Sequence, residues 1–266
     1  MIATKVCNDD RKSWLVEAIV HMSFPGMKAA MGRALLVCND AEAVRHVTEG
    51  MQQFAIATEA CNEVSLALRL LSHHKFEAAV IDLGLERANE VLEQIRLSRS
   101  NRTVVTFAIT ELQKPTGLKI QPHFAMEKPL SASSVGRTIK AAFGLIVRER
   151  RRSFRCPVTI PALILTNGKE ASCRLVNISE GGMAITETPS LQPGEQIRVL
   201  FALPGQRDRF TVESEVCWCD EKGSAGLRSL LISPEERSVL QEWLAAKLEK
   251  DLPEAVASQF RKNEPT

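Results

Sequence analysis

The apolar positions in the first half of the chain occur in two alternating arrangements. Continuous apolar runs predict buried strands, which lie at Ala34–Val37, Phe54–Thr58, Ala78–Leu83 and Thr103–Ile109. Apolar residues at three- and four-residue spacing predict helices, which lie at Ala41–Gln53, Glu63–His73, Ala88–Arg96 and Ser131–Phe143. Apolar strands that alternate with helices predict an α/β doubly wound parallel sheet, covered on both faces, over residues 32–147.

The second half of the chain has a different pattern. Short runs rich in β-branched residues predict strands at Val158–Thr166, Ser172–Asn177, Met183–Glu187, Gln196–Ala202, Phe210–Trp218 and Ala225–Leu231. Turn dipeptides such as Asn167-Gly168 and Pro193-Gly194 separate these runs. Regular short strands with such turns predict a second domain, an antiparallel β-barrel, over residues 156–250.

One helix is predicted after these strands. Ser233 is a favourable N-cap, Pro234 suits the first helical position, and Glu236 completes a capping box with Ser233. The apolar side chains of this helix predict a face that packs on the barrel, formed by Val239, Leu240, Trp243, Leu244 and Leu248. Both Trp218 and Trp243 are expected in the core, where barrel and helix meet.

The remaining segments are expected to be irregular. Residues 1–31 predict a weakly ordered leader with a short helix at Ser13–His21, and we expect translation to start at Met31 instead of Met1. Residues 251–266 are polar and predict a flexible tail. Residues 148–155 contain five arginines and predict an extended linker that also binds a ligand, with Glu149 as a bystander.

Composition narrows the class of protein. The 266 residues suit two domains, and a formal net charge of +2 gives no overall field that would attract nucleic acid. No apolar run approaches the ~20 residues that a membrane-spanning helix needs. The N-terminus lacks the long apolar core of a secretory signal, so we expect a cytoplasmic protein without membrane insertion.

The seven cysteines are expected to be free thiols in a reducing compartment. The closest pair, Cys217 and Cys219, flanks Trp218 on a predicted strand, and we expect both thiols to be packed. A zinc site would need two more ligands, and no CxxC or HxxxH pair supplies them. We therefore expect neither a metal nor a cofactor.

Three segments of the first domain resemble response-regulator receiver domains: Leu35–Asp40, Ala79–Leu85 and Glu127–Leu130. In that family an acidic pair after the first strand holds Mg²⁺, and an aspartate at the end of the third strand accepts phosphate. A lysine that precedes a proline contacts the phosphoryl group. The resemblance implies that Asp82 is the acceptor position and Lys128 the lysine.

The metal-binding pair of this family is missing from the sequence. The two positions that the family fills with acidic residues are Cys38 and Asn39, which carry no charge. The nearest acidic residue, Asp40, lies one position after this pair. A thiol is a poor ligand for Mg²⁺, which prefers oxygen. We therefore expect a degenerate receiver that takes no phosphate.

Other receiver positions are also altered. The family has a hydroxyl residue after the fourth strand. In the simplest alignment this position is Ala108, and Thr110 would occupy it only if the alignment were shifted. Asp82 and Lys128 are expected to persist as an ion pair in a vestigial phosphoacceptor pocket. Residual phosphorylation of Asp82 is the alternative.

Two motifs in the second half resemble those of PilZ domains, the cyclic di-GMP receptors. Arg151 and Arg155 match the RxxxR motif, and Asn177, Ser179 and Gly182 match the (D/N)xSxxG motif. The resemblance covers residues 150 to about 248 and includes the capped helix. It implies a ligand site for cyclic di-GMP at these residues.

These residue types suit that ligand chemically. Cyclic di-GMP carries two phosphodiester charges and two guanines, and arginine pairs bidentately with phosphate or with guanine O6 and N7. In an extended segment Arg151 and Arg155 would project to the same side. Asn177 and Ser179 offer an amide and a hydroxyl for a base edge.

Three further positions complete the predicted site. Gly181 and Gly182 would let the backbone approach the ligand where a Cβ would collide. Arg150 precedes the first motif arginine, and in PilZ domains an arginine there is associated with a stacked pair of ligands. The resemblance therefore implies two cyclic di-GMP molecules per domain.

The leading interpretation is a non-enzymatic receptor in which the arginine linker couples ligand binding to the orientation of the domains and to an unidentified protein partner. One alternative is a PilZ-fold interaction module that binds no ligand. Another is a receiver-coupled DNA-binding regulator, which the strand-rich second half and its acidic helix disfavour. No P-loop, dinucleotide fingerprint or catalytic triad indicates an enzyme.

Overall fold

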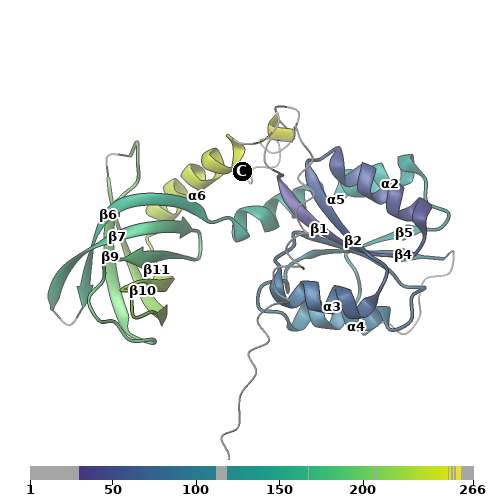
Figure 1. The fold of residues 1–266 in the computed structure, drawn as a ribbon. Coiled ribbons are helices and arrows are strands. Elements are labelled where there is room, and N and C mark those ends of the chain that lie inside the picture. Colours follow the sequence, from purple (N-terminus) through teal and green to yellow (C-terminus); the bar gives the residue numbers. More distant parts are fainter. Residues whose placement is uncertain are drawn as a thin grey trace, which may run out of the picture.

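Five parallel strands form the sheet of the first domain in the computed structural model (Figure 1), which describes residues 30–111, 119–166, 168–206, 208–250, 252, 254 and 256–258. The strands are β1 (Gly32–Val37), β2 (Ile56–Cys61), β3 (Ala78–Asp82), β4 (Val105–Thr110) and β5 (Phe124–Glu127). Their order, β2-β1-β3-β4-β5, is that of flavodoxin-like doubly wound folds. The predicted parallel sheet is confirmed, and β5 is a four-residue strand that the apolar pattern did not predict.

Helices cover both faces of this sheet (Figure 1). They are α2 (Ala41–Gln52), α3 (Val64–His73), α4 (Ala88–Leu97) and α5 (Ala132–Ser153), with α2 and α5 on one face and α3 and α4 on the other. Because side chains alternate along a strand, β1 contributes Leu36 to the core under α2 and α5. It contributes Leu35 and Val37 to the core under α3 and α4.

Helix α5 is longer than the sequence predicted. It was expected to end at Phe143, before an extended arginine linker, but it runs without interruption to Ser153. Arginine is a strong helix former, and cations near a helix C-terminus interact favourably with the helix dipole. Ile146, Val147 and Glu149 also continue the buried face of the helix. The prediction of an extended segment is therefore wrong for residues 148–153.

Six antiparallel strands form the second domain. They are β6 (Cys156–Thr166), β7 (Lys169–Ser179), β8 (Gly182–Thr186), β9 (Gln196–Ala202), β10 (Arg209–Cys219) and β11 (Ala225–Leu231). Each strand pairs with two neighbours in the closed order β10-β11-β8-β7-β6-β9, so the barrel has no free edge. The predicted antiparallel barrel is confirmed.

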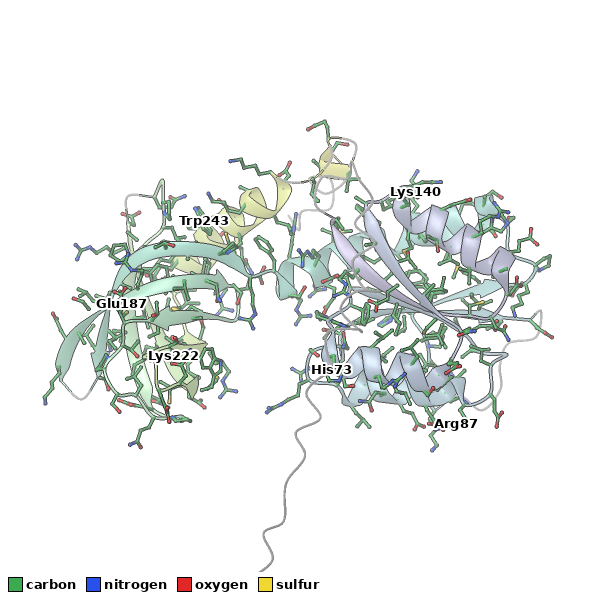
Figure 2. The ribbon with its side chains drawn as sticks, in the orientation of Figure 1. His73, Arg87, Lys140, Glu187, Lys222 and Trp243 are labelled. Carbon is green, nitrogen blue, oxygen red and sulfur yellow. The ribbon has the colours of Figure 1, made fainter. Side chains whose placement is uncertain are left out.

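Helix α6 (Pro234–Glu249) follows the barrel and begins at the predicted capping box. The Ser233 hydroxyl accepts a hydrogen bond from the Glu236 amide, and the Glu236 side chain accepts one from the Ser233 amide. The side chains of Leu240, Trp243 and Leu244 pack in the barrel core, as predicted. Trp243 lies where α6 meets the barrel (Figure 2).

The end of α6 and the residues after it pack on the first domain instead. Leu248 belongs to the core under α2 and α5, so the prediction that it packs on the barrel is wrong. Leu252, Val256 and Ala257 are buried in the same core, and for these residues the predicted flexible tail is also wrong. A single segment of the chain therefore contributes to both domains.

Three predictions concern residues outside the described part of the chain. These are the leader up to residue 29, the helix at Ser13–His21 and the last eight residues of the tail. Met31 itself is buried in the core, and its amide donates to the Ala55 carbonyl at 2.7 Å. In the part of the chain that the structure describes, no helix is both long and apolar enough to cross a membrane.

Trp218 is 50% exposed, so the prediction that it lies in the core is wrong. The register of β10 against β11 is irregular between Val216 and Trp218, which turns Trp218 away from the face on which Val216 is buried. Its ring instead lies against Gly226, where a Cβ would come within 2.0 Å of the indole nitrogen. Cys217 and Cys219 are free thiols but exposed, not packed as predicted.

Candidate ligand-binding site

The motif arginines lie where α5 leaves the first domain and the barrel begins. Arg150, Arg151 and Arg152 belong to the last turn of α5, and successive side chains on a helix point about 100° apart. Arg155 follows the helix and directly precedes β6. The sequence had suggested that Arg151 and Arg155 project to the same side of an extended segment. That prediction is wrong, because Arg151 is helical.

The second motif lies beside Arg155 because of strand register. Strands β6 and β7 are antiparallel, with Cys156 opposite Ile178. Arg155, just before β6, and Ser179, at the end of β7, are the next residues beyond this pair, and both line the cavity described below. The structure thus brings one residue from each predicted motif together.

Asn177 and Ser179 differ in how their polar atoms are used. The Ser179 side chain is buried, and its hydroxyl donates to the Gly182 carbonyl at 2.9 Å, which closes the turn between β7 and β8. The Asn177 Oδ1 atom is buried and accepts no hydrogen bond from the described residues. A buried acceptor without a donor costs free energy, so this oxygen is a site of unfavourable energy in the fold.

The two motif glycines have different roles. A Cβ on Gly182 would lie 2.1 Å from the Leu227 carbonyl oxygen, so glycine is required there by the neighbouring strand of the barrel. The sequence had suggested that position 182 is glycine because of the space that a bound ligand would need. The structure explains it by the close approach of the neighbouring barrel strand instead. A Cβ on Gly181 would meet nothing within 4 Å, so Gly181 faces open space.

A cavity of about 780 Å³ lies between the motif residues and the first domain. From the arginine segment and the barrel it is lined by Arg150, Arg152, Ser153, Arg155 and Ser179. From the first domain it is lined by residues at the start of β1 and in the segments before β3 and β4. Arg151, Asn177, Gly181 and Gly182 are not among its lining residues. Its volume is in the range of pockets that bury small organic ligands.

Two buried carboxylates fix the end of α5 to the first domain. Glu77 accepts hydrogen bonds from the Arg33 amide at 2.7 Å and the Ser153 hydroxyl at 3.0 Å, and it lies 3.7 Å from Arg150 Nη1. Glu149 pairs with Lys75 and accepts from the Thr103 hydroxyl at 2.8 Å. The prediction that Glu149 is a bystander is therefore wrong.

Phe154 connects the two domains at this point. Its partly buried ring packs against both the core under α2 and α5 and the barrel core. The Arg150 guanidinium also lies over this ring, with its carbon 5.6 Å from the ring centre. A change in the position of Arg150 would therefore alter the packing of Phe154 at the junction of the two domains.

The vestigial pocket lies at the carboxyl ends of the strands. Asp82 is 2% exposed and accepts hydrogen bonds from Lys128 Nζ at 2.7 Å and from the Gly84 amide at 2.9 Å. The Cys38 thiol lies 3.6 Å from the same carboxylate. The hydrogen bond that Lys128 donates to Asp82 raises the pKa of Lys128, and burial raises the pKa of Cys38. Both groups therefore stay protonated at neutral pH.

This pocket does not fit Mg²⁺. Cys38 presents a protonated thiol, and Asp40 Oδ1 accepts from the amides of Glu42 and Ala43 as the N-cap of α2. Within the described ranges, no three His, Cys, Asp or Glu residues are grouped so that they could hold a metal ion. Strand β4 ends at Thr110, not at Ala108. Asp82 lies opposite Ile109 in the sheet, so Thr110 is the next residue, and the expectation that Ala108 holds the hydroxyl position was wrong.

One family model matches part of the chain, namely the second domain together with the end of α5. Residues 149–246 match the family model described as "PilZ domain". No curated protein matches the chain. Over 37% of this chain, the fold is similar to the Bacillus subtilis inhibitor of motility, with 21% identity and a TM-score of 0.34. That match spans about half (51%) of the Bacillus protein.

Two further solved structures are similar to one domain each. The PilZ domain of CeSA from a cellulose-synthesising bacterium is 14% identical over 36% of this chain and 98% of its own, with a TM-score of 0.30. The Vibrio cholerae chemotaxis protein CheY4 is 16% identical over 42% of this chain and 98% of its own, with a TM-score of 0.39. The strand order of the first domain, β2-β1-β3-β4-β5, is the flavodoxin-like order that receiver domains have, so we call this domain receiver-like.

Proposed function

We propose that the protein is a non-enzymatic receptor that binds cyclic di-GMP where α5 meets the barrel, and the match of residues 149–246 to the PilZ domain model supports this proposal. The observation that carries this proposal is the convergence of Arg155 and Ser179, one residue from each motif, on the wall of one cavity. The second support is the Oδ1 atom of Asn177, two residues before Ser179, which accepts no hydrogen bond from the part of the chain that the structure describes.

The ligand chemistry follows from the groups present. Arg152 and Arg155 line the cavity and can pair bidentately with phosphodiester oxygens or with the O6 and N7 atoms of guanine. The Asn177 side chain does not line the cavity and would have to turn toward it before its carbonyl oxygen could accept from a guanine N–H. Charge-assisted hydrogen bonds contribute about 1.5–3 kcal/mol each. A few of them therefore suffice for a micromolar dissociation constant, about −8 kcal/mol.

We propose that Arg150 allows two ligand molecules to bind per domain. Its guanidinium is engaged by Glu77 and Phe154, and its Nε atom is buried with no hydrogen-bond partner in the described ranges. A second stacked ligand would compete with Glu77 for this guanidinium. Ligand binding would then loosen one attachment of α5 to the first domain, which couples the site to domain orientation.

Calorimetric titration of cyclic di-GMP into the full chain tests this proposal. We expect micromolar or tighter binding, with a molar ratio near two if Arg150 accepts the second molecule. Arg155→Ala should weaken binding by about 2–5 kcal/mol, because it removes a charged partner from the cavity. Arg209→Ala changes an exposed arginine at the start of β10, outside the cavity, and should bind as the wild type does.

An absence of heat from the wild-type protein, with no displacement of a labelled analogue, would contradict the receptor proposal. The same protein would then be better explained as a PilZ-fold interaction module that binds no ligand. Equal losses for Arg155→Ala and Arg209→Ala would contradict the location of the site. Binding of random duplex DNA with a steep salt dependence would instead favour a DNA-binding regulator.

We also propose that the receiver-like domain takes no phosphoryl group. Lys128 pairs with Asp82, and among the described residues no group of three His, Cys, Asp or Glu side chains could hold the cation that phosphoryl transfer requires. Addition of beryllium fluoride and Mg²⁺ should leave the amide NMR signals of Asp82 and Gly84 unchanged. Saturable shifts centred on these two residues would contradict this prediction.

A further inference from the structure

We infer that the receiver-like domain supplies the second half of the ligand site, through Arg99 and Arg102 in the loop between α4 and β4. This inference rests on the proposed function and extends it to residues outside the PilZ domain. It assigns these two arginines to the phosphodiester groups of the cyclic dinucleotide. The ligand would then be held between the two domains.

The position of the cavity on the first domain supports this inference. In a parallel sheet all strands start at the same edge. The starts of β1 and β3 and the loop before β4 therefore lie together, and they line the cavity with Arg33, Lys75, Arg99 and Arg102. Asp82 lies at the opposite edge of the sheet. The basic wall is therefore a different site from the vestigial pocket.

The charges of the cavity are not balanced. Three of its cations have carboxylate partners: Arg33 pairs with Glu59, Lys75 with Glu149, and Arg150 with Glu77. Four further guanidinium groups line the cavity, and none has a carboxylate within ion-pair distance in the described part of the chain; they belong to Arg99, Arg102, Arg152 and Arg155. Like charges that share a cavity repel one another, so this arrangement favours an anionic ligand.

The loop that carries Arg99 and Arg102 is held in place by Asn101, which lies between them and is fully buried. Its amide group donates to the carbonyls of Leu71 and His74, both at 2.9 Å, and its carbonyl accepts from the Phe76 amide at 2.9 Å. The two arginines therefore extend from a rigid backbone. A preorganised pair of donors loses less entropy on binding than a mobile pair.

The two walls together fit a small ligand with more than one negative charge. Arg152 and Arg155 belong to the PilZ side, and Arg99 and Arg102 to the receiver-like side. One cyclic dinucleotide carries two phosphodiester charges, and a stacked pair carries four, which matches the four lining guanidinium groups that have no carboxylate partner among the described residues. A ligand bound in this way would bridge the domains and oppose their separation.

The test uses the full chain and cyclic di-GMP as the probe. We expect Arg99→Ala and Arg102→Ala each to weaken binding about tenfold, and the double variant to weaken it more. Arg102→Lys should lose less than Arg102→Ala, because it keeps the charge. Arg69→Ala, at an exposed arginine on α3 outside the cavity, is the matched control and should bind as the wild type does.

A second measurement separates direct contact from an indirect effect. Hydrogen exchange of the backbone around residues 98–104 should slow when ligand is added to the wild type. The binding constant of the double variant should also depend less steeply on salt than that of the wild type, because fewer cations meet the phosphates.

The outcomes distinguish this inference from the proposed function. If wild type binds and Arg155→Ala does not, but the Arg99 and Arg102 variants behave like Arg69→Ala, the inference is wrong and the receptor function stands. Ligand protection confined to residues 150–182 would also overturn it. If the wild type binds no cyclic di-GMP, both are wrong.

Discussion

Replacement of Gly182 by alanine is expected to destabilise the barrel by about 3 kcal/mol or more. The new Cβ would lie 2.1 Å from the Leu227 carbonyl oxygen, 3.2 Å from its carbon and 3.4 Å from the Arg228 Cα. All three are backbone atoms of β11, the strand with which β8 pairs. The clash cannot be relieved by a side-chain rotation, so β8 and β11 must separate and the closed barrel must open locally.

Thermal unfolding followed by circular dichroism measures this effect, and the barrel transition should fall by roughly 10 °C or more. Gly181→Ala is the matched control, because the same change one residue earlier meets nothing within 4 Å. That variant should stay within about 0.5 kcal/mol of the wild type. Equal melting temperatures for the two variants would contradict the role of Gly182 as a barrel residue.

The sequence predicted both folds because each domain has a consistent local pattern. The strands of the first domain are buried on both faces and read as apolar runs, while the barrel strands are short and separated by turns. The order of elements then leaves few topologies. The errors lie where tertiary contacts override local composition, as in α5, whose polar end is held by buried contacts of Glu149 that no local pattern displays.

Trp218 illustrates a second limit. Strict alternation along β10 places it on the buried face with Val216, and one irregularity in the register is enough to turn it outward. Nothing in the sequence marks such an irregularity. The apolar stripe of α6 was correctly identified, but a stripe does not say which domain it will contact, and Leu248 contacts a different one from Leu240.

The candidate site was predictable only in part. The motif spacing indicated Arg155 and Ser179, and both line the cavity. Arg99 and Arg102 carry no motif and lie about fifty residues upstream, so only the fold brings them to the same cavity. The unsatisfied Asn177 oxygen is likewise a property of three-dimensional packing. The sequence therefore indicated residues on the PilZ side of the cavity and none on the side of the first domain.

Helix α6 offers a direct test of how the two domains are joined. Leu240 and Leu248 lie on the same helix, are the same residue type and are each 5% exposed. Leu240 packs in the barrel core, and Leu248 packs in the core of the receiver-like domain with Leu252 and Val256. Removal of a buried leucine side chain costs about 2–5 kcal/mol in either place, so the two variants should differ in where they act.

Leu240→Ala should therefore accelerate hydrogen exchange within the barrel strands, and Leu248→Ala should accelerate it in α2, α5 and the first sheet. Leu97→Ala, at a side chain that is 80% exposed, controls for the loss of a leucine without a cavity and should leave both domains unchanged. If Leu248→Ala loosens only the barrel, or changes nothing, α6 belongs to the barrel alone. If the effects separate as expected, the end of α6 is a structural part of the receiver-like domain. Any movement of the barrel that ligand binding causes must then act on that domain through α6 as well as through α5.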